Sequence, residues 1–160
     1  MATDNDFFQV LGRISVVFSA LDLIVTLIIR GLVVNNLVKD KDTLGKKLMY
    51  LAKLQAHDVT DANVLNGIQS LLPKAQPIVE SRNRFIHDQW VLDAQMVAAA
   101  AVRRIKLIDV ADSACGIEWT KVTLSELNGF CDELVKLQYK FCPLYDQVRE
   151  KAGLPLLTLK

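Results

Sequence analysis

The sequence predicts an all-α fold: one domain over residues 1–160, built as a bundle of four to five helices. A short irregular or β-hairpin excursion is expected after the third helix. Apolar residues return at steps of three and four through most of the chain, and cap residues stand where these runs begin. Only 7 glycines and 4 prolines interrupt 160 residues. The apolar share of 51% and the mean hydropathy of +0.24 are enough for a sizeable core, so disorder is not expected.

The first helix is expected to begin at Thr3 or Asp4, both good N-cap residues. An apolar seam then recurs at helical spacing through Phe7, Leu11, Ile14, Phe18, Leu21, Val25, Ile28 and Leu32. Further apolar residues lie on the other faces, so one buried stripe does not account for them. We therefore expect a second interface on this helix and infer a homodimer.

The apolar run from Ile14 to Val34 is long enough to be tested as a membrane span. Asp22 lies near its middle and Arg30 near its end. A charge at the bilayer centre costs roughly 2.5–3.5 kcal/mol, and residues 1–8 lack the basic start of a signal peptide. We read a soluble helix of a cytoplasmic protein with no membrane role. Asp22 is expected to pair with an arginine of the motif described below, or equally with Arg13 or Arg30.

The middle of the chain predicts two more helices. The second runs from about Thr43 to Ala56, and the third begins at Thr60 or Asp61. Pro73 and Pro77 are expected to kink or break the third helix, which then resumes from Ile78 to His87.

Residues 91–118 are harder to assign. Alternation over Val102–Ile108 indicates a short hairpin, whereas the run of four alanines before it favours a helix. Residues 111–116 are expected to form a turn. Thr123–Glu126 reads as a capping box that opens a last helix, which ends near Lys151, before Gly153 and Pro155.

The end of the third helix gathers groups that are hard to bury, in the sequence Glu80–Trp90. On a helix, Glu80, Asn83, Arg84 and His87 fall on one face at i, i+3, i+4 and i+7. Arg82 lies about 140° from His87 in projection, yet a long arginine near a helix end can still reach the same cleft.

This set of side chains has a possible chemistry. Imidazole titrates near neutrality and acts as a general acid or base, and a guanidinium stabilises charge that develops on a phosphate. Together they suit cleavage of RNA through its own 2′-hydroxyl, which requires no metal and no cofactor. The alternative from composition alone is a satisfied, partly buried polar network.

The segment "RNRFIH" resembles the motif of the HEPN superfamily, an arginine and a histidine separated by four to six residues. Arg82 matches the motif arginine, Asn83 the polar residue that often follows it, and His87 the histidine. Glu80 corresponds to an acidic residue often found just upstream, and "IHDQW" is similar to the His-Gly-x-Trp ending of bacterial members. The order of helices also agrees across most of the chain.

The resemblance implies a helical bundle that dimerises so that two motifs face one cleft. It implies metal-independent RNA cleavage in many members, often in toxin–antitoxin or other defence settings with a possible antitoxin or partner protein. Arg82, His87 and Asn83 would then be catalytic, with Glu80, Asp88 and Arg84 in support. Asp88 stands where the family usually has glycine, and many members are silent scaffolds. The second hypothesis is therefore a non-catalytic module that binds a partner protein or a nucleotide, and the third is a coincidental motif.

Five positive charges lie between residues 82 and 106 against Asp88 and Asp93, a local balance of +3. If the excursion folds back over the motif, Arg103, Arg104 and Lys106 form a patch for the RNA backbone. A solvated basic face is an equal alternative. Trp90 and Trp119 are expected to be core or interface anchors rather than platforms for bases.

Overall fold

A computed structural model of the chain describes residues 2–34, 42–87, 89–110 and 114–153. Within these ranges, the side chains of residues 83–87, 89, 105–110 and 114–117 lie outside the description. The elements follow in the order α1 (Asp4–Leu32), α2 (Leu44–Lys53), the 3₁₀ turn η1 (Ala56–Asp58), α3 (Ala62–His87), β1 (Gln89–Val91), α4 (Ala94–Ala98), β2 (Ala101–Val110), β3 (Ala114–Thr123) and α5 (Leu124–Ala152). The predicted helical bundle with a hairpin excursion is confirmed.

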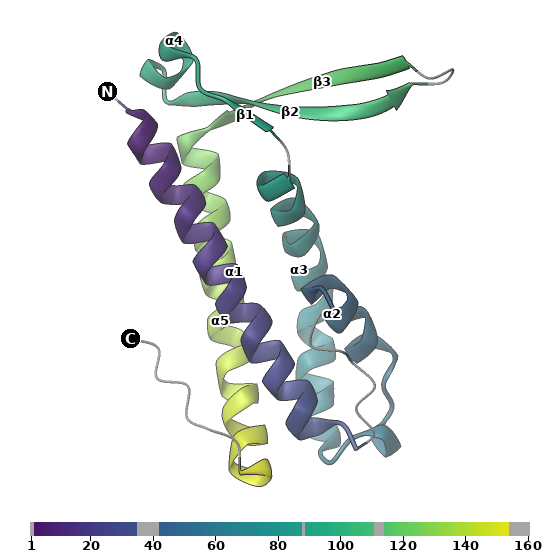
Figure 1. Cartoon of the computed structure of the whole chain (residues 1–160). Helices are drawn as coiled ribbons and strands as arrows, with labels where there is room; N and C mark the ends of the chain where they lie inside the picture. The colour runs from purple at the N-terminus through teal and green to yellow at the C-terminus, as the bar shows by residue number, and fades with distance from the viewer. Residues whose placement is uncertain (1, 35–41, 88, 111–113, 154–160) are drawn as a thin grey trace.

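The bundle is built around two long helices, α1 and α5, which lie side by side and run in the same direction (Figure 1). The third helix, α3, runs in the opposite direction, and α2 packs against it. The core lies between them and is almost entirely apolar, with Phe7, Ile14, Leu21, Leu134 and Phe141 at 1% exposure or less. The one buried charged side chain among the described residues is Lys47.

Cap residues set the helix starts, as the sequence predicts. At α5 the backbone N–H of Thr123 donates to Glu126 at 2.7 Å, and the backbone N–H of Glu126 donates to the Thr123 hydroxyl at 3.1 Å. Asp61 accepts from the N–H groups of Asn63 and Val64 and so begins α3. The capping box and the predicted start of α3 are confirmed, and Gly153 ends α5 in the left-handed region at φ 64°.

Two predicted boundaries are wrong. Of the kink or break predicted at Pro73 and Pro77, the break and the restart at Ile78 are wrong, since α3 runs as one helix from Ala62 to His87 with both prolines inside it. Each proline removes one backbone hydrogen bond, but the buried side chains of Leu72, Ala75 and Val79 hold that stretch against the core. The second helix ends at Lys53 rather than near Ala56.

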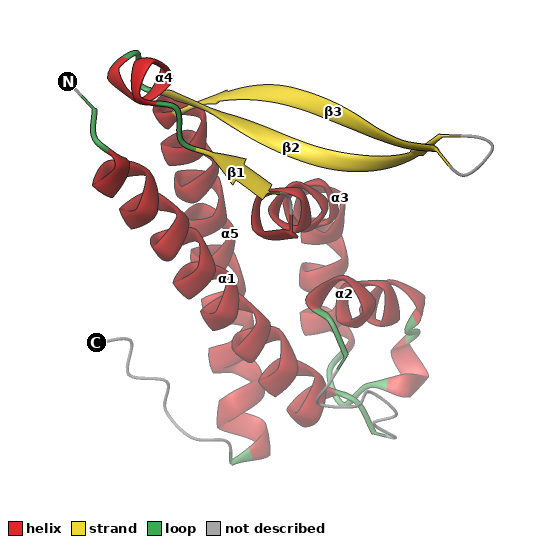
Figure 2. Cartoon of the chain, turned by 45° about the horizontal axis from the view of Figure 1, so that its top comes forward, coloured by secondary structure: helices red, strands yellow, loops and turns green. Residues whose placement is uncertain are grey.

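The excursion is a three-stranded antiparallel sheet in the order β1-β2-β3. Its hairpin is longer than predicted, with ten residues in each of β2 and β3. The predicted turn at residues 111–116 is too long, because residues 114–116 already belong to β3, and residues 111–113 lie outside the described part. Both predictions for the alanine run hold for part of it. Ala98 ends the short helix α4, and Ala101 begins the strand β2. The sheet crosses one end of the bundle, and the β2–β3 ribbon projects beyond it (Figures 1 and 2).

Among the described residues, α1 is the one helix long and apolar enough to cross a membrane. A core helix of a soluble bundle passes the same test. Eleven of its residues are buried inside the chain, among them Ile24, Val25 and Ile28. Length and composition alone therefore carry no argument for a membrane span.

Candidate functional site

Arg82 is the residue of the predicted motif whose side chain the structure describes, and it faces α1. Its Cζ atom lies 4.0 Å from the centroid of the Phe18 ring, within the range of a cation–π interaction. The guanidinium is partly buried. Burial lowers the pKa of Arg82, and the negative charge of Asp22 acts in the opposite direction. Arg82 is thus held against α1, close to Asp22, the acidic residue within the apolar stretch of that helix.

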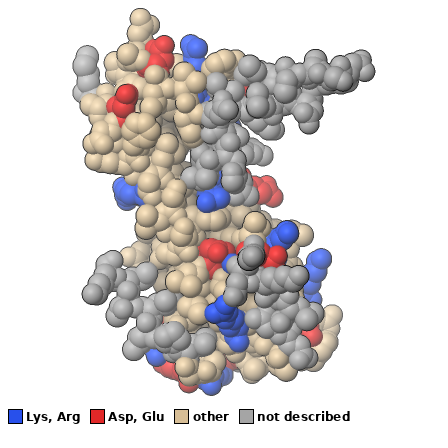
Figure 3. Space-filling model, in the orientation of Figure 1, with Lys and Arg blue, Asp and Glu red and all other residues tan. Residues whose placement is uncertain are grey.

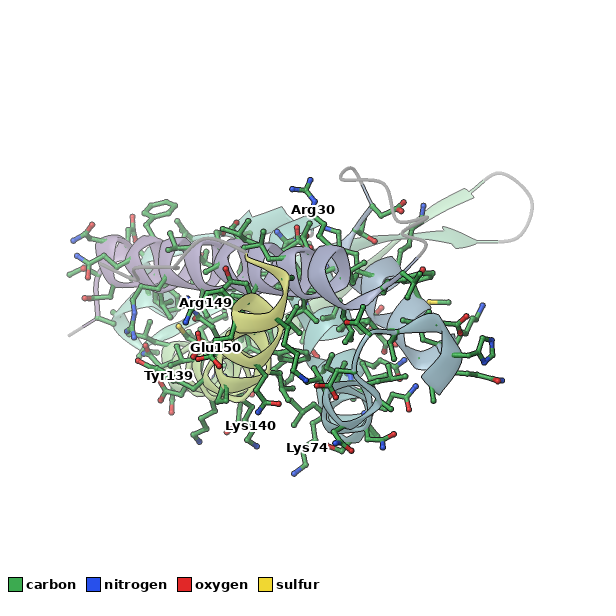
Figure 4. The ribbon with its side chains drawn as sticks, turned by 90° about the horizontal axis from the view of Figure 1, so that it is seen from below. Arg30, Lys74, Tyr139, Lys140, Arg149 and Glu150 are labelled. Atoms are coloured by element: carbon green, nitrogen blue, oxygen red, sulfur yellow. The ribbon has the colours of Figure 1, made fainter. Side chains whose placement is uncertain are left out.

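Asp22 forms an ion pair with Lys47 of α2. The Lys47 ammonium donates to both carboxylate oxygens at 2.9 and 3.0 Å and to the Thr26 hydroxyl at 2.8 Å. Lys47 is only 1% exposed, whereas the Asp22 side chain is 35% exposed. The carboxylate therefore has one side turned to a buried cation and another open to solvent. The predicted alternatives Arg13 and Arg30 are not its ion-pair partners, and Figure 4 shows Arg30 directed away from the bundle.

A cavity of about 400 Å³ opens beside this ion pair. Three helices line it: α1, the N-terminal end of α2, and α3. Its lining residues are Phe18, Ser19, Asp22, Thr43, Leu44, Gly45, Val79 and Arg82. The cavity combines an aromatic ring, two hydroxyl groups, a carboxylate and a guanidinium, and so offers a phosphate or a base both polar and apolar contacts.

The remaining motif residues are distributed unevenly. Glu80 is exposed and lines a neighbouring groove with Met49 and Gln76, on another side of α3 from Arg82. The backbones of Asn83, Arg84 and His87 belong to α3, and their side chains lie outside the described residues, as does the whole of Asp88. The structure therefore brings Arg82 to Asp22 and separates it from Glu80.

The predicted basic patch falls on β2, next to the motif. The strand β1 begins two residues after His87 and pairs with β2, so that Trp90 lies opposite Arg104 and Val91 opposite Arg103. Neighbouring residues of a strand point to opposite faces, which separates the two arginines. Arg103 is exposed and Arg104 is half-buried, and the side chain of Lys106 lies outside the described residues.

The two tryptophans differ. Trp90 packs against the core, in line with the prediction. Trp119 is 53% exposed, so it is not a core residue, and the Cζ atom of Arg103 lies 5.7 Å from its ring centroid.

Sequence reasoning missed Lys47 as the partner of Asp22. One signal was present, because Lys47 stands among Leu44, Leu48 and Leu51 at the spacing of a buried helix face. No cluster of three His, Cys, Asp or Glu side chains suited to a metal occurs in the described part of the chain.

Comparison of the chain with protein-family models, with curated proteins and with solved structures found no match. The likeness of the segment RNRFIH to the HEPN motif therefore stays a prediction from the sequence.

Proposed function

We propose that the chain is a metal-independent endoribonuclease that acts as a homodimer in the cytoplasm, with Arg82, Asn83 and His87 in a composite cleft. The observation that carries the proposal is the position of the RNRFIH segment. It forms the last turns of α3, at the point where the bundle meets a strand pair carrying Arg103 and Arg104. A toxin–antitoxin or other defence role, with an antitoxin or another partner protein, follows from the family likeness.

The reaction needs only the RNA and ionisable side chains. The 2′-oxygen bonds to phosphorus while the bond from phosphorus to the 5′-oxygen breaks, which leaves a 2′,3′-cyclic phosphate and a 5′-hydroxyl. His87 accepts the proton of the 2′-hydroxyl or donates a proton to the leaving 5′-oxygen. In a dimer, the partner's His87 supplies the second of these two proton transfers. Arg82 stabilises the charge on the pentacoordinate phosphorane, and Asn83 orients the reacting phosphate group.

A strip on the outer side of α1 supports the dimer. Phe8, Val16 and Leu23 are 60%, 70% and 49% exposed and recur at helical spacing, with Gly12 and Ser19 between them. None of these five residues of the α1 strip is charged, and the face seen in Figure 3, where α1 runs in Figure 1, is mostly uncharged with scattered charges of both signs. Ser19 also lines the Arg82 cavity, so a second copy seated on the strip would cover that cavity.

Val16→Asp is expected to convert the dimer to a monomer, because it places a charge at the centre of the α1 strip. The mass in solution, measured by light scattering across a range of concentrations, checks this. Tyr139→Asp is the matched control, since Tyr139 is 68% exposed on α5 and Figure 4 shows it on the side of the bundle away from α1. A wild-type chain that is monomeric at all concentrations, or a Val16→Asp variant that stays dimeric, would contradict the proposed interface.

Incubation of the wild-type chain with an unstructured RNA in EDTA tests the function. We expect cleavage fragments with 2′,3′-cyclic phosphate and 5′-hydroxyl ends, because the nucleophile belongs to the substrate. Intact RNA across several sequences, at concentrations where the chain is dimeric, would contradict the proposal.

A second candidate is a non-catalytic module that binds a nucleotide or a partner protein through the same cavity. The contact of Arg82 with Phe18 favours it, because the guanidinium there stabilises the packing of α3 on α1. Binding of a nucleotide in the absence of any RNA cleavage would identify this function.

A further inference from the structure

The sheet has one face turned to the core and one turned to solvent. Val102 and Val122 lie opposite each other and are 1% and 4% exposed, which marks the inner face. Arg103 follows Val102 and Lys121 precedes Val122, so these two side chains point to the opposite, outer face. The outer face therefore carries Val91, Arg103, Trp119 and Lys121, all of which are exposed.

The strand register arranges this part of the sheet in two neighbouring rows. Val91, Arg103 and Lys121 face one another in the first row, and the backbones of Gln89, Ile105 and Trp119 are aligned in the second. Two inter-strand spacings separate Trp119 from Gln89, on the order of 10 Å. Gln89 follows His87 by two residues, so the second row begins at the end of the proposed catalytic motif.

The side chains of this face have the chemistry of a single-strand binding surface. An exposed indole offers a flat face on which any base can stack, and cations beside it hold the phosphates. Arg103 lies diagonally across from Trp119, with 5.7 Å from its Cζ atom to the ring centroid. Lys121 lies directly opposite Arg103. Both described charges on this face are positive, and Glu118 alternates to the other face. This charge favours a polyanion over an apolar partner surface.

We propose that the outer face of the sheet, centred on Trp119 with Arg103 and Lys121, binds single-stranded RNA and leads it to the end of α3. The inference rests on the proposed function in that it names the form of its substrate. A single strand is required because the bases of a duplex are stacked on one another and leave no free face for the indole.

The test is binding of a fluorescein-labelled 12-nucleotide oligouridine in the His87→Ala background, where the probe stays intact. Trp119→Ala is expected to weaken binding about 5- to 150-fold, the range for loss of one stacked base. The matched control is Tyr139→Ala, which removes an aromatic ring of 68% exposure from α5 and leaves the affinity unchanged. Titration with RNA is expected to quench the tryptophan fluorescence, and this quenching is lost in Trp119→Ala.

Arg103→Gln gives a second and independent reading. It removes one phosphate contact, so the slope of log K against log salt should fall by about 0.7 for a single strand. The proposal is overturned if Trp119→Ala binds oligouridine like the control, or if a duplex of the same length binds equally well. It is also overturned if Trp119→Ala turns a dimer into a monomer, because the outer face of the sheet would then be the contact surface for a second copy of the chain. Binding is measured without cleavage, so absence of ribonuclease activity in the wild type would contradict the proposed function and leave this test intact.

Discussion

His87→Ala is expected to lower the rate of RNA cleavage in EDTA by at least about 100-fold. Positioned general acid–base catalysis contributes roughly 10²- to 10⁴-fold, and each dimer loses both of its motif histidines in this variant. The measurement is the initial rate of cleavage of a labelled RNA at equal dimer concentrations of the two proteins. Molecular mass and the thermal unfolding midpoint are measured on the same samples to show that the fold and the dimer persist.

His57→Ala is the matched control, because these are the two histidines of the chain. The His57 side chain lies in η1, is 76% exposed, and has Nε2 3.3 Å from a carboxylate oxygen of Asp58. We expect its loss to leave cleavage unchanged. Equal rates for His87→Ala and the wild type would remove His87 from the mechanism. A His87→Ala variant that is monomeric would make the residue structural instead.

Asp22→Ala is expected to destabilise the fold by about 3 kcal/mol, or about 6–12 °C in the unfolding midpoint of a chain of this size. The variant leaves the Lys47 ammonium, which is 1% exposed, with the Thr26 hydroxyl and without its carboxylate. Breaking a buried ion pair on one side costs about 3–5 kcal/mol, and the lower end applies because Asp22 is partly open to solvent.

The double variant Asp22→Ala/Lys47→Met separates the destabilisation caused by the unpaired Lys47 charge from the destabilisation caused by lost packing around Asp22. Methionine keeps most of the apolar stem of Lys47 and removes the ammonium, so most of the lost stability should return. Chemical denaturation of the wild type and both variants measures this. Equal instability of the single and double variants would show that the loss comes from packing around Asp22, and an unchanged single variant would show that the ion pair contributes nothing.

The helices of this fold could be predicted from the sequence because their signals are local. Apolar spacing marked α1, and Thr123 with Glu126 formed the predicted capping box that opens α5. The continuity of α3 could not be predicted in the same way. Pro73 and Pro77 are local breakers, and the packing that overrides them comes from residues distant in the chain.

The candidate site shows the same division. The motif at the end of α3 and the unusual position of Asp22 were both visible in the sequence. The choice of Lys47 over the arginines as the ion-pair partner depends on how α2 packs beside α1, which no local pattern encodes. Similarly, the exposure of Trp119 follows from the strand register, because a shift of one residue would turn its side chain to the inner face.

Arg82 connects the stability of the bundle to its proposed chemistry. Its guanidinium rests on Phe18 and lines a cavity together with Asp22, while His87, five residues further along the chain, carries the proposed proton transfer. An RNA phosphate entering the cavity would compete with Asp22 for that guanidinium. The pairing of Asp22 with Lys47 lessens this competition, since the carboxylate is already neutralised.

Cleavage of a matched pair of oligonucleotides in EDTA tests the proposed ribonuclease most directly. One is all RNA, and the other has 2′-deoxynucleotides throughout and is otherwise identical. We predict that the wild-type dimer cleaves the RNA to fragments with 2′,3′-cyclic phosphate ends and leaves the deoxy strand intact. Cleavage of both strands would contradict attack by the 2′-hydroxyl, and cleavage of neither would contradict the ribonuclease itself.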